Sequence, residues 1–294
     1  MTTQAYKVDD VSVVNTGNLM SDNAFAGFQA LIFKSAGISM SNAKKPLVAG
    51  RLAKRLRATN IATYDEYLHY LTKGDGFHNG EFQHCIDLLT TNETYFYREP
   101  QHFDFLIKEV ISKHNPDKMF RVWSAASSSG EEAYTLAMIL SEKLGVGAKW
   151  EVIGTDISTK MVAAARKGIY IDHRARMVPA DIRYKYLLKG TGENDGFVAV
   201  APELKRHVRF EHYNLVDSPH RNEAFDVIFC RNVLIYFNQE TKKKVLTRLS
   251  NHIKPGSFLI TGHSESLHGM LPQLQAIKPS IYIRTARNSG KHDA

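Results

Sequence analysis

From Pro100 onward, the chain alternates short apolar runs with helical segments, and this alternation constrains the fold more than any other feature. Runs with the character of buried strands occupy residues 120–126, 150–157, 225–229, 257–266 and 280–286. Helical patterns occupy residues 102–114, 130–145, 158–170 and 239–253, the last of them expected to stop at Pro255 and Gly256. Strands that alternate with helices predict a parallel sheet covered on both faces. We therefore predict an α/β domain over residues 101–288.

One region interrupts this alternation. Two runs of strand character, residues 184–190 and 197–202, flank the turn sequence TGENDG, and a third run follows at residues 207–215. Glycine, asparagine and aspartate between two such runs are typical of a hairpin turn. We therefore expect an antiparallel β-subdomain inserted into the α/β domain over about residues 182–213.

The N-terminal part of the chain has helical patterns and no convincing strand. Helices are predicted over residues 24–36, 44–60, 63–74 and 80–92. Thr63 and Glu66 have the spacing of a capping box, and Pro46 lies where a first-turn proline is tolerated. These patterns predict a small all-α domain over residues 21–90, joined to the α/β domain by an interdomain segment at residues 91–100. Residues 1–20 and 289–294 are expected to be flexible tails.

The composition narrows the cellular setting. The formal net charge of +8 favours an acidic partner, and nucleic acid, anionic lipid and an acidic protein surface all fit it. The two cysteines, Cys85 and Cys230, cannot build a disulfide framework, which favours a reducing compartment. The N-terminus has no signal-peptide pattern, and no apolar run reaches the ~20 residues of a membrane span. We expect a cytoplasmic protein without direct membrane insertion.

The residues after the first two predicted strands indicate a ligand class. The turn SSSGEE, residues 127–132, has the single glycine Gly130 and so lacks a dinucleotide fingerprint. Glu131 and Glu132 would repel a pyrophosphate and suit an ammonium group, or they only complement the helix dipole. Asp156 ends the second strand, where an acid can bind ribose hydroxyls, unless Asp156 or Ser158 only caps the next helix. The combination predicts S-adenosylmethionine, which has a ribose and an ammonium group but no phosphate.

Two further stretches are unusually polar for their surroundings. CRNVLIYF, residues 230–237, places Arg231 directly after a buried strand, where an arginine is costly unless it is ion-paired or lies at a ligand site. NETYFYRE, residues 92–99, groups polar side chains around three consecutive rings. Either this second stretch closes one domain over a ligand held by the other, with its rings excluding water, or it is an aromatic hinge with a salt-bridged Arg98.

NETYFYRE, WSAASSSGEEAYTLA, GTDIS and FCRNVLIYF occur in this order, and together they resemble the chemotaxis receptor methyltransferases, the CheR family. The resemblance covers most of the chain. It implies a Rossmann-like S-adenosylmethionine-dependent methyltransferase domain behind an all-α receptor-docking domain. It also implies methyl transfer to glutamate side chains of methyl-accepting chemoreceptors, for adaptation in bacterial chemotaxis, with S-adenosylhomocysteine as product. One departure is Ala133, where the family usually has proline; this early helix position tolerates both.

Position by position, the resemblance also implies roles for site residues. The cofactor-binding residues that it implies are Asn92, Thr94, Arg98, Glu132 for the ammonium group in preference to Glu131, Asp156 for the ribose, Asn214 and Leu215 for the adenine, and Arg231 and Asn232 for the remaining edge. A glutamate acceptor, with a pKa of about 4.3, is already anionic and needs no general base. We expect catalysis by alignment, in which Arg98 orients the acceptor carboxylate and Tyr236 borders the methyl group. No metal is expected.

The second predicted helix has a basic side and an apolar side. Its basic residues, with no acid between them, include Lys44, Lys45, Arg51, Lys54 and Arg55. Leu52 and Leu56 share another face. The basic side is either a solvated surface or, as the resemblance implies, a docking face for the cytoplasmic helices of chemoreceptors, to whose membrane-bound arrays the protein would be recruited.

Other functions fit the sequence less well. A nucleic-acid methyltransferase would need an Asn/Asp-Pro-Pro-aromatic tetrapeptide or a Pro-Cys nucleophile, and the sequence has neither. A non-catalytic receptor-binding adaptor and a methyltransferase with another acidic protein acceptor remain as alternatives. We expect a monomer. Whether the inserted subdomain also binds the C-terminal tether peptide of the receptor by strand addition stays open.

Overall fold

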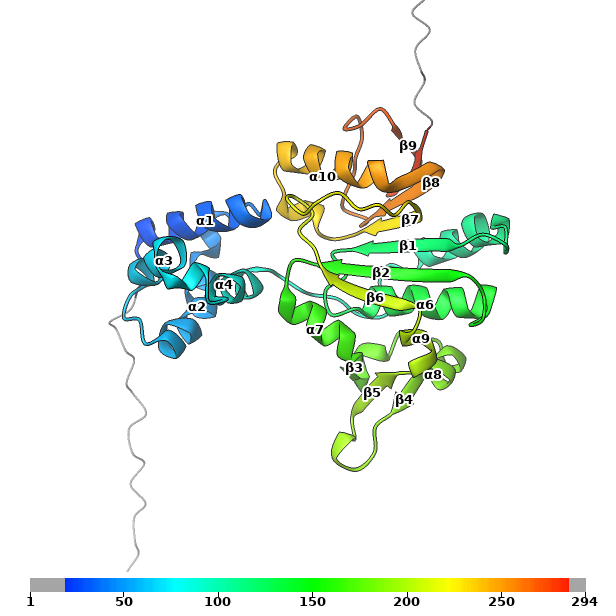
Figure 1. Ribbon diagram of the computed structural model, residues 1–294, viewed down its shortest axis with the longest axis horizontal. Helices are drawn as coiled ribbons and strands as arrows, with labels where there is room; N and C mark the ends of the chain where they lie inside the picture. The colour runs from blue at the N-terminus through cyan, green and yellow to red at the C-terminus, as the bar shows by residue number, and fades with distance from the viewer. Residues whose placement is uncertain (1–18, 286–294) are drawn as a thin grey trace, which may run out of the picture.

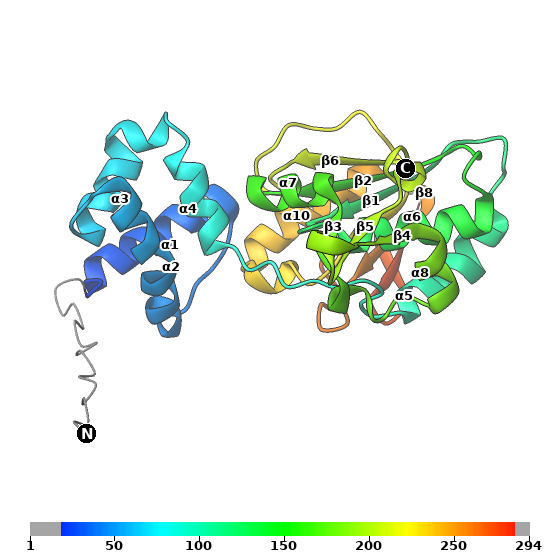
Figure 2. The same ribbon diagram turned by 90° about the horizontal axis from the view of Figure 1, so that it is seen from below.

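The computed structural model describes residues 19–285, which form a helical domain beside a larger α/β domain (Figure 1). The segment after the last helix of the first domain joins the two, as Figure 2 shows from below. The helical domain contains α1 (Asp22–Ala36), α2 (Lys45–Thr59), α3 (Tyr64–Lys73) and α4 (Glu81–Leu89), with short 3-10 turns η1 (Asn42–Lys44) and η2 (Asp75–Phe77). The predicted helices of this domain are therefore confirmed.

The helical domain has its own apolar core. Phe28, Leu52 and Tyr67 are fully buried in it. The capping box at the start of α3 is confirmed, since Thr63 and Glu66 each accept a hydrogen bond from the other's backbone N–H. The predicted tail over residues 1–20 was too long, because Met20 is only 4% exposed and packs into this core. Residues 1–18 and the predicted tail at 289–294 lie outside the described residues.

The α/β domain is built on a twisted mixed sheet with the strand order β6-β2-β1-β7-β8-β10-β9. Its strands are β1 (Phe120–Ala125), β2 (Trp150–Asp156), β6 (Val208–His212), β7 (Phe225–Cys230), β8 (Ile253–Thr261), β9 (Leu274–Lys278) and β10 (Ile281–Arg284). Strands β6, β2, β1, β7 and β8 are parallel, and β10 is antiparallel to both of its neighbours. The predicted Rossmann-like α/β fold is confirmed.

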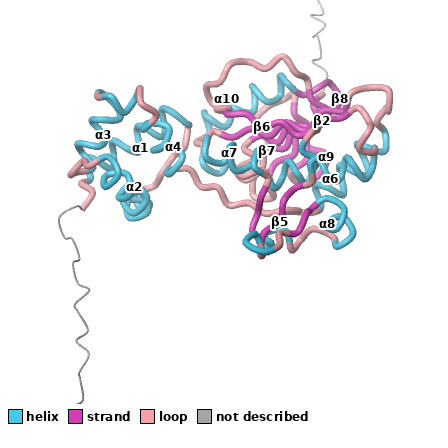
Figure 3. Tube along the Cα trace, turned by 60° about the horizontal axis from the view of Figure 1, so that its bottom comes forward, coloured by secondary structure: helices cyan, strands magenta, loops and turns pink. Residues whose placement is uncertain are grey.

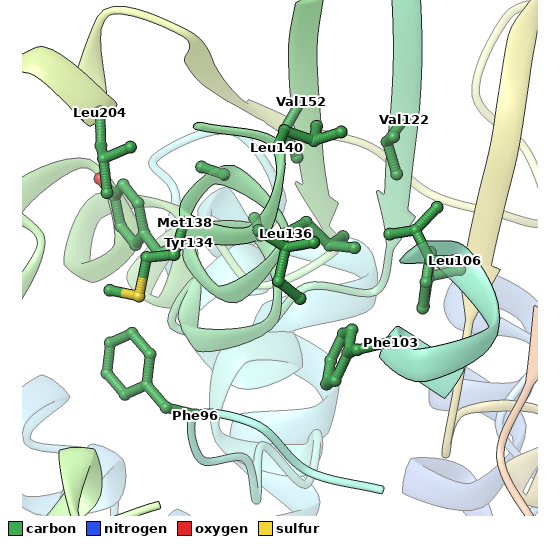
Figure 4. Close-up of a cluster of buried hydrophobic side chains, with 14 of the residues drawn as sticks. Phe96, Phe103, Leu106, Val122, Tyr134, Leu136, Met138, Leu140, Val152 and Leu204 are labelled. Carbon is green, nitrogen blue, oxygen red and sulfur yellow. The ribbon is translucent and has the colours of Figure 1, made fainter. Parts of the chain in front are cut away.

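Helices cover both faces of this sheet, as the cyan and magenta layers of Figure 3 show. One face packs against α5 (Gln101–Phe105), α6 (Glu131–Leu144) and α7 (Thr159–Lys167), and the other packs against α10 (Gln239–His252). Successive strand residues point to opposite faces. Val122 and Val152 therefore lie in the first layer, which Figure 4 shows, while Trp123 and Ile153 lie in the second.

Three predicted helices of this domain end or continue differently from the expectation. The helix predicted at 102–114 is α5 followed by a π-helical turn, η3 (Leu106–Val110), and a 3-10 turn, η4 (Ile111–Lys113). Helix α7 ends at Lys167, because Gly168 adopts the left-handed conformation that closes a helix. Helix α10 ends at His252, and the predicted stop residues Pro255 and Gly256 lie inside β8 instead, where the pairing with β7 is irregular.

The inserted subdomain exists, but the predicted boundaries of 182–213 were wrong at both ends. Its sheet has the order β3-β5-β4, from β3 (Ile169–Ile171), β4 (Leu187–Lys189) and β5 (Phe197–Val200), and all pairs are antiparallel. It also carries η5 (Asp172–Ala175), α8 (Ala180–Tyr186) and η6 (Gly192–Asn194), and α9 (Pro202–Lys205) leads back to the main sheet. The run at 207–215 contains β6, which pairs parallel to β2 in the main sheet. The subdomain is thus the segment from β3 to β5.

Candidate active site

A cleft of about 410 Å³ lies between the two domains, at the carboxyl ends of the parallel strands. In an open α/β sheet this is the position at which ligands bind, and the volume suits a small-molecule ligand. Its walls come from the helical domain, the interdomain segment and the loops after β1, β2, β6 and β7. The cleft brings together every predicted cofactor-binding and catalytic residue: Asn92, Thr94, Arg98, Glu132, Asp156, Asn214, Leu215, Arg231, Asn232 and Tyr236.

The loop after β1, residues 126–130, is called the cofactor loop below, and it has an unusual backbone. Ala126, Ser128 and Gly130 have φ angles of 67°, 49° and 97°. Residues other than glycine enter this left-handed region at a cost, and such outliers gather at functional sites. The Ser128 N–H donates to Asp156 Oδ2 at 2.8 Å, so the loop is tied to the end of β2.

The two glutamates after this loop have separate surroundings. Glu132 lines the cleft, and its carboxylate accepts hydrogen bonds from Ser124 Oγ at 2.7 Å and from Arg231 Nη1 at 2.9 Å. Glu131 is fully buried outside the cleft lining, where it accepts from Ser129 Oγ and Arg174 Nη1. Burial raises the pKa of Glu131, against the hydrogen bonds that favour its charged form. The geometry therefore makes Glu132 the one that can pair with an ammonium group.

Asp156 is 6% exposed and lies at the floor of the cleft. Its Oδ1 accepts from the Ser158 N–H at 2.9 Å and its Oδ2 from Ser128, which leaves further lone pairs free for ligand hydroxyls. Burial raises the pKa of Asp156, and the two backbone hydrogen bonds oppose that rise. The side-chain cap of α7 is Ser158, whose Oγ accepts from the Met161 N–H. Asp156 is thus available for a ribose.

An arginine directly after a buried strand was expected either to be ion-paired or to lie at a ligand site. Arg231 is ion-paired and also lines the cleft. Its side chain is 2% exposed and bridges Glu132 at 2.9 Å and Glu99 at 3.1 Å. It also donates to the Arg98 carbonyl and lies over the Phe103 ring. The arginine therefore holds the interdomain segment against the sheet.

Two acidic residues in this network were missed by the sequence analysis. Glu99 binds Arg231 and also accepts from Asn232 Nδ2 at 3.2 Å. Glu265, 5% exposed, accepts from the backbone N–H groups of Asn232 and Gly262 through one oxygen and from that of Ile235 through the other. The available signals were the position of Glu99 inside NETYFYRE and that of Glu265 just after the strand ending at Thr261.

The three rings of the interdomain segment do not act alike. Tyr95 lines the cleft and is 40% exposed, with the Arg98 guanidinium 5.8 Å from its ring centre. Phe96 is fully buried in the α/β core, and Tyr97 packs against Phe103. The expectation of a row of rings over the ligand is therefore corrected to one ring. Arg98 Nη1 donates to the Glu93 carbonyl at 2.8 Å, and within residues 19–285 no carboxylate forms the salt bridge with Arg98 that the hinge interpretation requires.

The helical domain closes the remaining side of the cleft. Asn214 Nδ2 donates to the Ser35 carbonyl at 2.6 Å, and the Ser39 N–H donates to the Tyr236 carbonyl at 2.8 Å. The side-chain amide of Asn214 is thus used to join the domains. Its expected adenine contact, like that of Leu215, stays a prediction.

The basic residues of the predicted docking face on α2 have different surroundings in the structure. Arg51 lines the cleft and donates to the carbonyls of Leu89 and Thr90, and Arg55 makes two hydrogen bonds to Glu81 at 2.7 and 2.5 Å. Burial raises the pKa of Glu81, but its hydrogen bonds to Arg55 and Tyr67 outweigh burial and leave the pKa lowered. Both arginines thus make contacts within the protein, and their predicted docking role stays a prediction. The docking role also stays a prediction for Lys44, for Lys45, which pairs with the exposed Asp22, and for the exposed Lys54.

Glu99, His102 and His263 place potential metal-ligand atoms within 4.8 Å of one another. The Glu99 carboxylate in this group is already bound by Arg231, by Asn232 and by the backbone N–H of His263. Burial and the nearby Arg231 lower the pKa of His102 to about 4. A cation would have to displace the guanidinium from the carboxylate, and we assign no metal here.

An α/β sheet with an acid at the end of its second strand, a glycine-poor loop after its first and a carboxylate facing the cleft is typical of S-adenosylmethionine-dependent methyltransferases. The model of the CheR methyltransferase SAM-binding domain matches residues 92–283, and that of the CheR all-alpha domain matches residues 23–90. The chain therefore belongs to the CheR methyltransferase family.

Curated relatives agree with this assignment. The chemotaxis protein methyltransferase of Escherichia coli K12 is 38% identical over 249 residues, 84% of this chain and 85% of the relative. That of Borreliella burgdorferi is 36% identical over 262 residues, 86% of this chain and 90% of the relative. The protein is thus a methyltransferase with S-adenosylmethionine as its cofactor, and the expected enzyme class is confirmed.

Proposed function

We propose that this protein transfers a methyl group from S-adenosylmethionine to glutamate side-chain carboxylates of chemoreceptors, which gives a methyl ester and S-adenosylhomocysteine. The observation that carries the proposal is the cleft itself, which combines acidic groups for the cofactor with cationic groups for an anionic acceptor. Glu132 and Asp156 lie on the side of the sheet. Arg98 lines the cleft from the interdomain segment, Arg51 lines it from α2, and the exposed Lys44 lines it from η1. An acidic acceptor fits this arrangement.

The cofactor-binding roles rest on the donors and acceptors of the cleft. Glu132 would pair with the ammonium group and Asp156 with the ribose hydroxyls, since both carboxylates face the cleft and keep free lone pairs. Asn92, Thr94, Arg231 and Asn232 complete the walls. When bound, the cofactor supplies an activated methyl group.

The chemistry that remains for the protein is alignment. A glutamate carboxylate with a pKa of about 4.3 is anionic at cellular pH, so its oxygen is already a nucleophile. Arg98 would orient this carboxylate, and Tyr236, which also lines the cleft, would border the reacting methyl group and exclude water. Arg98→Ala should then reduce turnover, while its unfolding transition stays unchanged. Unchanged turnover would remove Arg98 from the mechanism.

The proposed partners are the cytoplasmic helices of chemoreceptors, met by a monomer of this protein at the receptor arrays. Lys44 at the end of η1 and Lys45 and Lys54 on α2 would attract their acidic surfaces, an effect on association rate more than on affinity. The tether peptide of a receptor is a second proposed ligand, which would add a strand at an edge of the antiparallel sheet. None of the helices in residues 19–285 has the length and apolar content to cross a bilayer.

The proposed acceptor chemistry can be tested with methyl-labelled S-adenosylmethionine and receptor-bearing membranes of the same cell. We expect label to enter protein and to leave as methanol under mild base, because a carboxyl ester is base-labile. Label that enters protein but resists base would indicate a nitrogen or another acceptor and would contradict the proposal. The inactive control is the Arg98→Ala variant, which should fold like the wild type but label poorly.

A further inference from the structure

The cofactor loop needs support from outside its own backbone. Its left-handed residues are unfavourable by themselves, and Gly130 has no room for a side chain, because a Cβ there would lie 2.8 Å from that of Ala165. Asp156 supplies one such contact, by accepting a hydrogen bond from the Ser128 N–H. A strained loop keeps one conformation only if several such contacts over-determine it.

Further hydrogen bonds to the cofactor loop come from the antiparallel subdomain. Tyr170 of β3 is 4% exposed, and its hydroxyl donates to the Ser129 carbonyl at 2.7 Å. Arg174 of η5 donates from Nη1 to Ser129 Oγ at 3.2 Å and to Glu131 Oε1 at 2.5 Å. The subdomain therefore forms hydrogen bonds with Ser129 in the cofactor loop and with Glu131 at the start of α6.

The same strand also touches the interdomain segment. The rings of Tyr170 and Phe96 meet edge to face, with centroids 5.0 Å apart. Phe96 directly follows Tyr95, which lines the cleft. On the other side of β3, Ile169 and Ile171 are 56% and 55% exposed. Strand β3 thus presents its outward face to solvent and its inward face to Ser129 and Phe96, each of which is next to a residue that lines the cofactor cleft.

We propose that Tyr170 and Arg174 are positioning residues, which hold the cofactor loop in its binding conformation and so couple the antiparallel subdomain to cofactor affinity. Neither residue lines the cleft, so both act through Ser129 and Glu131. Coupling of this kind is reciprocal: a cofactor that orders the loop also stabilises β3 and η5, and whatever stabilises that part of the subdomain tightens cofactor binding. The proposal requires only that the protein binds S-adenosylmethionine, and it does not depend on the acceptor.

The tyrosine hydroxyl can be tested against a close control. Tyr170→Phe removes the hydroxyl that binds the loop, while Tyr134→Phe removes a buried hydroxyl that donates to the Ala165 carbonyl at 2.9 Å. Loss of one such hydrogen bond is expected to weaken S-adenosylhomocysteine binding, measured by calorimetry, about three- to tenfold in Tyr170→Phe. The KM for the cofactor should rise by the same factor with kcat little changed. Affinity equal to wild type, or an equal loss in Tyr134→Phe, would overturn the proposal.

The role of Arg174 is tested with one substitution that removes its charge and one that keeps it. Arg174→Gln should weaken S-adenosylhomocysteine binding, Arg174→Lys should restore part of the affinity, and Arg176→Gln, at an exposed neighbour, should have no effect. Hydrogen exchange tests the coupling directly: bound S-adenosylhomocysteine should slow exchange in residues 168–176 of the wild type, and less so in Tyr170→Phe. Exchange in this segment that does not respond to the ligand would show that the subdomain is not coupled to the site.

Discussion

Replacing Glu132 by glutamine gives a sharp test of the cofactor site. The substitution keeps the size of the side chain and an oxygen that can accept from Ser124, but it removes the negative charge that faces the cleft. A hydrogen bond to a charged group contributes about 1.5–3 kcal/mol. Loss of the pairing with the ammonium group should therefore weaken S-adenosylhomocysteine binding by about 10- to 150-fold.

The fold should tolerate this change better than the binding does. Arg231 loses one carboxylate partner but keeps Glu99 at 3.1 Å and the Arg98 carbonyl. We expect a loss of about 1–2 kcal/mol in the free energy of unfolding, measured in urea. Glu142→Gln is the matched control, because Glu142 lies on the same helix and pairs with Lys185 at the surface.

Calorimetric titration with S-adenosylhomocysteine separates the two outcomes. We expect Glu142→Gln to bind like the wild type and Glu132→Gln to bind at least tenfold more weakly at 25 °C. If Glu132→Gln bound within twofold of the wild type while still folded, the assignment of Glu132 to the ammonium group would be refuted.

Two further predictions concern stability. Arg55→Ala leaves Glu81, 5% exposed, without its cation and should lower the free energy of unfolding by about 2–4 kcal/mol. Lys54→Ala, at an exposed position, should change this free energy by under about 0.5 kcal/mol. Equal effects of the two substitutions in urea titrations would contradict the structural role of Arg55. Burial, followed by the neighbouring His220, lowers the pKa of His252 from 6.5 to about 4. As the pH falls from 6.5 towards 4, His252 becomes protonated in the unfolded chain but stays neutral in the folded protein. The free energy of unfolding should therefore fall by up to about 1.4 kcal/mol per pH unit. His252→Gln should lose less stability than the wild type between pH 7 and pH 5, and an equal loss would exclude His252 as the cause.

The parts of the fold that could be predicted are those whose local pattern and tertiary position agree. β1, β2 and β7 are mostly apolar because they are buried on both faces of a parallel sheet, and only the second residue of each, Arg121, Glu151 or Asp226, is partly exposed. β9 was missed because all of its residues except Leu274 are exposed. β6 was assigned to the wrong sheet because it lies at the edge of the main sheet and its alternating pattern resembles that of an antiparallel strand.

The site followed a similar division. Residues at the end of a strand, such as Asp156, or directly after one, such as Arg231, could be predicted because the topology itself brings them to one edge of the sheet. Glu265 could not, because it binds Asn232 across 33 positions in the sequence and only the fold sets that distance. Charge pattern alone also could not show that Arg55 is held by Glu81, since the two residues lie on different helices.

The most direct test of the account is a crystal structure of the protein with S-adenosylhomocysteine bound. The account predicts the ligand in the cleft between the domains, with its ammonium group within hydrogen-bond distance of Glu132 and its ribose hydroxyls at Asp156. Its sulfur should face the space between Arg98 and Tyr236. A ligand bound outside this cleft, or one bound with its ammonium group away from Glu132, would contradict the assignment on which the mechanism rests.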